Sequence, residues 1–287
     1  MKASCYYILL SILPLGLAGQ QQVLKSNSLS SGSTSNSTTV LKVDDKQKNK
    51  VGELKQDIKT LGEAVSADAE VVIVGTASPA NVNVNFVALY GGFIKTAEQQ
   101  EEEEAFLKDC DKNFPSRVEA SQFFSKSGWD YLSEGGKDLA THRFNLAWTL
   151  NKENVEAYWG LGVVAYQQGD YHSAIELMDQ GLVLNKGQSP TLLVDLATVY
   201  IKCFTEHKEA AEMEKANELL EKALVLDPSF TNAYMQLSLA SLVNDNIDQA
   251  WLNFHKAYEV DPNGVSVELL AELLEHKSDP KGIFKKP

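Results

Sequence analysis

The stretch "GWDYLSEGGKDLATHRFNLAWTLN", Gly128–Asn151, decides the fold because its marker residues return at a fixed interval. The markers recur 34 residues further on: Gly128, Gly135, Ala140, Ala147, Leu150 and Asn151 correspond to Gly162, Gly169, Ala174, Gly181, Leu184 and Asn185. The same interval links Ala216, Leu220, Ala223, Asp227 and Pro228 to Ala250, Phe254, Ala257, Asp261 and Pro262. Self-similarity at such a period indicates a repeat architecture.

The size of the side chains agrees with a helix–turn–helix unit. Small residues stand where the first helix of each repeat must approach the second: Gly128, Gly162, Ala197 and Ser238. Small residues also stand where the second helix packs back: Ala140, Ala174, Ala216 and Ala250. Larger apolar residues then fill the space between repeats: Phe144, Met178, Leu220 and Phe254.

This pattern resembles the tetratricopeptide repeat (TPR), a 34-residue helix–turn–helix unit. The resemblance implies an all-α fold, a right-handed α-solenoid of about four repeats over residues 121–264. The repeats are assigned to 121–154, 155–188, 190–230 and 231–264. The third is longer, because Ala197 to Ala216 spans 19 positions where Gly162 to Ala174 spans 12. Either its helices run longer or a charged loop protrudes.

Capping helices are expected on both sides of the repeats. Thr96 with Gln99, and Ser116 with Glu119, have the spacing of capping boxes, so we expect an N-terminal capping helix and lead-in over residues 96–120. Residues 265–287 contain an amphipathic helix and a tail, and the helix is expected to cover the open edge of the last repeat.

The N-terminus, "MKASCYYILLSILPLGLAGQQQ", has the features of an export signal over residues 1–19. Small residues allow cleavage after Ala18 or Gly19, and Gln20 stands where a lipoprotein would have its acceptor cysteine. We therefore expect an exported protein, periplasmic or extracellular, without lipidation at the cleavage site; the alternative is an uncleaved anchor. Residues 20–60 read as a flexible polar linker. Residues 61–95 read as short extended segments, so the region before the repeats is expected to be disordered or weakly structured.

Composition limits the partners. The net charge of −13 argues against nucleic acid and anionic membranes, and no membrane span is expected after signal cleavage. Cys110 and Cys203 remain in the mature chain, and they form either one disulfide or two isolated thiols.

The sequence contains no recognisable catalytic constellation. Its five histidines are scattered, and no HExxH, G-x-S-x-G or phosphate-binding glycine loop is present. We therefore expect no enzymatic activity, no cofactor and no metal site.

A TPR solenoid offers a groove lined by the first helices of its repeats. We expect this groove to hold a protein or peptide segment, with these residues as the partner-binding positions: Trp129, Trp159, Val163, Tyr166, Gln167, Thr198, Lys202, Met235 and Leu239. The alternative for each is packing against a neighbouring helix or the N-terminal segment. TPR domains that hold acidic chaperone C-termini use a Lys/Asn clamp. Ser125 and Trp129 occupy the corresponding positions in the first repeat, so that partner is not expected.

The segments "GWDYLSEG", "RFNLAW" and "AYWGLG" are also similar in sequence to those of uncharacterised exported bacterial TPR proteins. The similarity implies a bacterial envelope setting. The leading hypothesis is an exported, non-enzymatic protein–protein interaction scaffold. The alternative is a structural or assembly component of the envelope that self-associates, and the sequence leaves the oligomeric state open.

Overall fold

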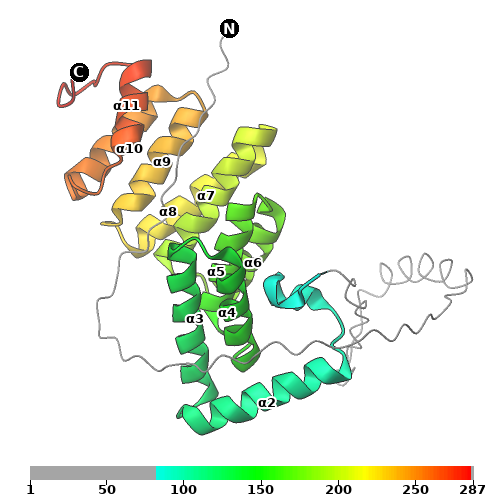
Figure 1. Cartoon of the computed structure of the whole chain (residues 1–287). Coiled ribbons are helices and arrows are strands. Elements are labelled where there is room, and N and C mark those ends of the chain that lie inside the picture. Colours follow the sequence, from blue (N-terminus) through cyan, green and yellow to red (C-terminus); the bar gives the residue numbers. More distant parts are fainter. Residues whose placement is uncertain (1–81, 286–287) are drawn as a thin grey trace, which may run out of the picture. The chain divides into compact units, whose positions relative to one another are not determined.

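The computed structural model describes residues 82–285, which all lie in one compact unit (Figure 1). Ten α-helices and two short 3-10 helices make up this part, and residues 82–285 contain no β-strand. The expected signal, the linker and the segment 61–81 lie outside the described residues.

Four pairs of helices form the repeats. The pairs are α3 (Arg117–Ser133) with α4 (Lys137–Leu150), α5 (Val155–Gln168) with α6 (Tyr171–Leu184), α7 (Pro190–His207) with α8 (Ala210–Leu226), and α9 (Thr231–Val243) with α10 (Ile247–Val260). Helices within a pair pack together, and each pair packs on the next (Figure 1). The expected all-α TPR solenoid is confirmed. We call α3, α5, α7 and α9 the A helices and their partners the B helices.

The extra length of the third repeat lies in its helices. Helix α7 ends at His207 and α8 begins at Ala210, so no long charged loop protrudes. The chain reverses at Lys208, which has a left-handed backbone with φ of 61°. The first of the two alternatives drawn from the sequence is therefore correct.

The N-terminal capping helix is α2 (Ala97–Asn113). Its capping box is confirmed: Thr96 Oγ1 accepts from Gln99 N at 3.2 Å, and Gln99 Oε1 accepts from Thr96 N at 2.9 Å. Ser116 caps α3 through its hydroxyl, which accepts from Glu119 N at 3.2 Å. The second half of the expected box differs, because the Glu119 carboxylate accepts from the Ser116 hydroxyl at 3.4 Å and not from its backbone N–H. Both helix starts were therefore predictable from side chains that satisfy free backbone N–H groups.

The C-terminal cap consists of α11 (Val267–His276) and the tail that follows it. Leu273 of α11 is fully buried, as expected for a helix that covers the end of the repeats. The tail folds back because Asp279 Oδ2 accepts from Ile283 N at 2.7 Å and Phe284 N at 2.9 Å. The Phe284 ring then stacks on Trp251 of α10, with ring centroids 6.4 Å apart.

The prediction of extended segments is wrong for residues 82–92. This region forms two 3-10 helices, η2 (Val84–Phe86) and η3 (Ala88–Gly92). The reason is Asn145 of α4, whose Oδ1 accepts from Leu89 N at 2.9 Å, while its Nδ2 donates to the carbonyls of Asn85 at 3.0 Å and Val87 at 2.8 Å. A side-chain amide thus satisfies backbone groups for which a strand would need a neighbouring strand.

The two cysteines in residues 82–285 are separate thiols. Cys110 and Cys203 are both free and buried. Burial raises the pKa of the Cys203 thiol to about 11, which keeps it protonated at neutral pH. The disulfide alternative is excluded.

Close approach at the small residues holds the helix pairs together. Phe144 of α4 is fully buried against two A helices. A Cβ atom added at Gly128 would lie 2.7 Å from its ring, and one added at Gly160 would lie 2.1 Å from it. In the next repeat, a Cβ at Gly162 would lie 2.6 Å from Met178 Cγ. The expected packing of small residues of one helix against large residues of the next is therefore confirmed. Because Gly160 belongs to the second repeat, the Phe144 ring makes this contact in two repeats.

We expect Gly128→Ala to lower the free energy of unfolding by about 1–2 kcal/mol, because overpacking outweighs the roughly 1 kcal/mol that alanine gains in a helix. Urea denaturation monitored by circular dichroism measures this change. Ser133→Ala, at an exposed site of the same helix, is the matched control. The loss should shrink in a Phe144→Leu background, because a smaller side chain leaves room for the methyl group. A Gly128→Ala variant as stable as the wild type would contradict the assigned contact.

Candidate binding groove

A cavity lies among the A helices at the C-terminal ends of α5 and α7. Its volume is about 290 Å³, and α5, α7, α9 and α11 all contribute to its lining. The following predicted groove residues line it: Tyr166, Thr198, Lys202 and Leu239. The sequence therefore located residues from three repeats that the fold brings together.

The cavity combines an apolar floor with a charged rim. Ile201, Leu239 and Leu242 form the floor and are all nearly buried. Lys202 on the rim pairs with Glu206 at 3.0 Å, which holds the pKa of that carboxyl below its usual range. Lys208 lies on the same rim, with Nζ 5.0 Å above the Phe204 ring. A concave apolar site with a few polar groups is typical of ligand pockets.

The two predicted tryptophans lie further along the A helices and contact each other. Trp129 of α3 and Trp159 of α5 pack edge to face, with ring centroids 5.1 Å apart. Trp129 also meets Phe144 at 5.2 Å. Both rings are only partly buried, so they pack between repeats and still present surface. The packing alternative is therefore correct for part of each ring, and partner binding by the exposed part stays a prediction.

Each indole donates to a carboxylate of the next A helix. Trp129 Nε1 donates to Glu156 Oε2 at 2.7 Å, and Trp159 Nε1 donates to Asp195 Oδ2 at 2.8 Å. Neither carboxylate was among the predicted groove residues. Nothing in the sequence indicates a special role for Glu156, because an acidic residue in the first turn of a helix is commonly stabilised by the helix dipole.

Asp195 is the more informative of the two acidic residues. It is 5% exposed, and burial raises the pKa of its carboxyl to about 7, although the Trp159 hydrogen bond opposes that rise. A lone aspartate inside the apolar run "LLVDLATVY", Leu192–Tyr200, was the available signal. Perturbed carboxyl groups of this kind are enriched at functional sites.

The remaining predicted groove residues do not reach the cavity. Val163 and Met235 are 2% and 6% exposed and belong to the hydrophobic core, so their expected place on the open face is wrong. Each A helix packs against its B helix and its neighbouring A helices, which narrows the open face. Gln167 is exposed, and its backbone carbonyl accepts from Lys137 Nζ at 2.8 Å.

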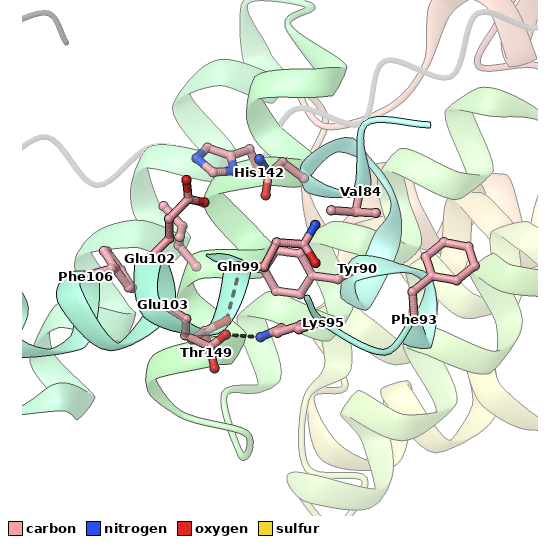
Figure 2. Close-up of a pocket in the computed structure, with 12 residues that line it drawn as sticks. Val84, Tyr90, Phe93, Lys95, Gln99, Glu102, Glu103, Phe106, His142 and Thr149 are labelled. Carbon is pink, nitrogen blue, oxygen red and sulfur yellow. Dashed lines mark hydrogen bonds and ion pairs between the residues drawn. The ribbon is translucent and has the colours of Figure 1, made fainter. Parts of the chain in front are cut away.

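Two other cavities are weaker candidates. One, of about 290 Å³, lies between η3, α2 and α4, where Figure 2 shows Tyr90, Lys95, Glu103 and Thr149 around it. Its lysine and glutamate pair with each other, and Thr149 donates to the Tyr90 hydroxyl at 3.1 Å, so these groups are already satisfied. The second, of about 470 Å³, lies between α8, α9 and α10. Five carboxamide side chains contribute to its lining: Asn217, Asn244, Asn246, Gln249 and Asn253.

Residues 82–285 contain no cluster of three or more side chains suited to hold a metal ion. Across the same range, no helix has the length and apolarity needed to cross a bilayer.

Asp195→Asn should change how stability depends on pH. The folded pKa is raised, so the unfolded chain ionises first, and the free energy of unfolding of the wild type falls as pH rises from about 4 to about 7. Relative to the variant, the wild type should lose about 2–3 kcal/mol between about pH 5 and pH 8. The asparagine Oδ1 can still accept from Trp159. Urea denaturation at several pH values measures the difference, and parallel profiles would contradict the assignment.

Comparison with known proteins gives similarity to solved structures only. No family model matches the chain, and no curated protein matches it. PilF of Pseudomonas aeruginosa is 22% identical, with a TM-score of 0.48 over 56% of this chain and 70% of that one. TTC0263, a TPR protein of Thermus thermophilus, is 20% identical, with a TM-score of 0.49 over 54% of this chain and 82% of that one.

A TPR domain of Spaghetti (RPAP3), solved with an HSP90 peptide, is 21% identical, with a TM-score of 0.37 over 43% of this chain and 92% of that one. These values are too low to carry an inference about function. The fold assignment rests on the molecule itself, in which small residues at a 34-residue interval lie at the contacts between paired helices. The four helix pairs of this chain form a tetratricopeptide-repeat solenoid.

Proposed function

We propose that this protein is a non-enzymatic scaffold that binds a segment of a partner protein on its A-helix face. The observation that carries the proposal is the cavity between the A helices, whose apolar floor and polar rim come from several repeats. The A-helix face is defined as this cavity together with Trp129, Trp159, Glu156 and Asp195. Half-buried tryptophans beside a preformed cavity supply large contact area at small entropic cost.

Helices α5 and α7 each contribute to both parts of the A-helix face, the tryptophan pair with its carboxylates and the cavity. Trp159 and Tyr166 stand two helical turns apart on α5, and Asp195 and Lys202 stand two turns apart on α7. Seven residues of helix rise by about 10 Å, so the tryptophan pair and the cavity are separated by about that distance. An extended peptide spans this distance in about three residues.

We also propose that the protein acts outside the cytoplasm, in the periplasm or the extracellular space. The support is the N-terminal sequence, with its apolar core Tyr6–Leu17 and the small residues that follow.

Photocrosslinking tests the binding face. Tyr166→p-benzoylphenylalanine places the reactive group at the cavity, and Leu252→p-benzoylphenylalanine places it on the exposed side of α10 as the control. We expect a discrete adduct in cells from the first position only. Thr205→Tyr should fill the cavity and reduce the adduct several-fold, whereas Glu214→Tyr, on the exposed side of α8, should not. Equal adducts from both crosslinker positions would overturn the proposal.

Export is tested separately. The mature protein recovered from the cell envelope or the medium should begin at Gly19 or Gln20, as measured by N-terminal sequencing and intact mass. A chain that retains Met1 and is found only in the cytoplasmic fraction would refute export and leave the binding proposal untouched.

A further inference from the structure

The strongest feature not yet used is an unpaired negative charge beside an aromatic surface. Glu156 and Asp195 each accept one hydrogen bond from a neutral indole, and within residues 82–285 neither forms an ion pair. The basic group nearest to Asp195 along α7 is Lys202, and that lysine pairs with Glu206. The acidic groups are therefore not neutralised by the chain's own lysines and arginines in the described region.

A buried carboxylate without a charged partner is costly for the folded protein. Asp195 is almost completely buried, and Trp159 contributes only one dipolar contact to it. Within residues 82–285, Asp195 Oδ1 accepts no hydrogen bond. A ligand that supplied a positive charge and a donor at this position would remove the cost.

The neighbouring aromatic rings favour a cation for a second reason. The edge-to-face arrangement of Trp129 and Trp159 leaves part of each indole exposed next to Glu156 and Asp195. An indole face attracts a cation through its quadrupole, and a planar guanidinium can stack on the ring while donating to carboxylates. Arginine meets both conditions in a fixed geometry, whereas lysine offers a point charge without the planar fork.

We infer that the segment held on the A-helix face carries an arginine, whose guanidinium stacks on the Trp129–Trp159 pair and donates to Glu156 and Asp195. This inference rests on the proposed function and specifies its partner: a basic segment with an apolar residue about three positions from the arginine, in the cavity floored by Leu239. The net charge of −13 favours the approach of such a segment over long range. The ring contacts and carboxylates then select arginine at short range.

Binding should also depend on pH. Without ligand, burial holds the Asp195 carboxyl partly protonated near neutral pH, and a guanidinium would favour the ionised form. The other titratable groups of the A-helix face come from α5, α7, the turn after α9, and α11. Burial raises the pKa of Glu156, although the Trp129 hydrogen bond opposes the rise, and burial raises the pKa of Tyr166 to about 12. Lys202 lowers the pKa of Glu206, and Asp245 and His276 line the cavity. Affinity for the arginine segment should therefore weaken on acidification as the carboxyl groups of Asp195 and Glu156 take up protons, and Asp195→Asn should reduce this pH dependence.

The probes are two amidated, acetylated peptides, Gly-Arg-Gly-Ser-Leu-Gly and its reverse-order form Gly-Leu-Ser-Gly-Arg-Gly. Citrulline and lysine versions of each are compared with them. Citrulline keeps the shape of arginine and removes its charge. Binding to the mature full chain is measured by calorimetry and by tryptophan fluorescence. At least one arginine peptide should bind more tightly than its citrulline version by about tenfold, the loss typical of a hydrogen bond to a charged group. The lysine version should fall between them.

The variants Asp195→Asn and Glu156→Gln should each weaken the arginine peptide by about tenfold, and circular dichroism checks that both remain folded. Glu214→Gln on α8 removes one charge far from the tryptophans and should leave the affinity unchanged. Equal effects of all three variants would mean attraction to an acidic surface only and would overturn the inference. Failure of both arginine peptides to bind below about 1 mM would do the same.

The outcome is separable from that of the proposed function. If Tyr166→p-benzoylphenylalanine forms its adduct and the peptides show no dependence on arginine, the face binds a partner of other chemistry. If the adduct also fails to form, both proposals are wrong.

Discussion

The contact on which the structure depends most is the fit of Phe144 against the backbones of two neighbouring A helices. Its ring leaves no space for a Cβ atom at Gly128 or Gly160, so the first two repeats meet at a distance that only glycine permits. The same ring supports Trp129 from behind at 5.2 Å. One buried side chain thus sets the spacing of the repeats and the orientation of an aromatic residue on the A-helix face. A substitution at Phe144 would therefore alter both the packing of the core and the position of Trp129.

The repeats were predictable because their signal is carried by size and spacing, which the sequence states directly. Gly162 against Met178 follows the same rule as Gly128 against Phe144, and the helix caps at Thr96 and Ser116 follow from hydroxyl chemistry. The segment 82–92 was not predictable by this route. Its alternation of valine and asparagine resembles a strand, but Asn145, more than fifty positions away, satisfies its backbone. Only the folded structure shows a partner at that distance.

The lining of the cavity among the A helices was predictable in part, for a related reason. Helical geometry gives the direction of a side chain but not how closely the neighbouring helices approach. Tyr166, Thr198, Lys202 and Leu239 reach the cavity, whereas Val163 and Met235 point into the packed core. The role of Asp195 does not follow from helical periodicity, because periodicity identifies apolar anchors and gives no partner for a single aspartate. Its indole partner comes from another repeat, so its setting follows from the stacking of repeats.

Asp195 gives the clearest link between stability and function in this chain. A leucine or asparagine there would avoid the cost of a buried carboxylate, and the run Leu192–Tyr200 is otherwise well suited to a core helix. Structural reasons alone do not require the acid, because the Trp159 indole needs only a neutral acceptor. Glu156, an exposed residue in the first turn of α5, accepts from the indole of the other tryptophan. A buried acid without a charged partner and a second acid, each bonded to a partly exposed indole, are better explained by a cationic ligand than by packing alone.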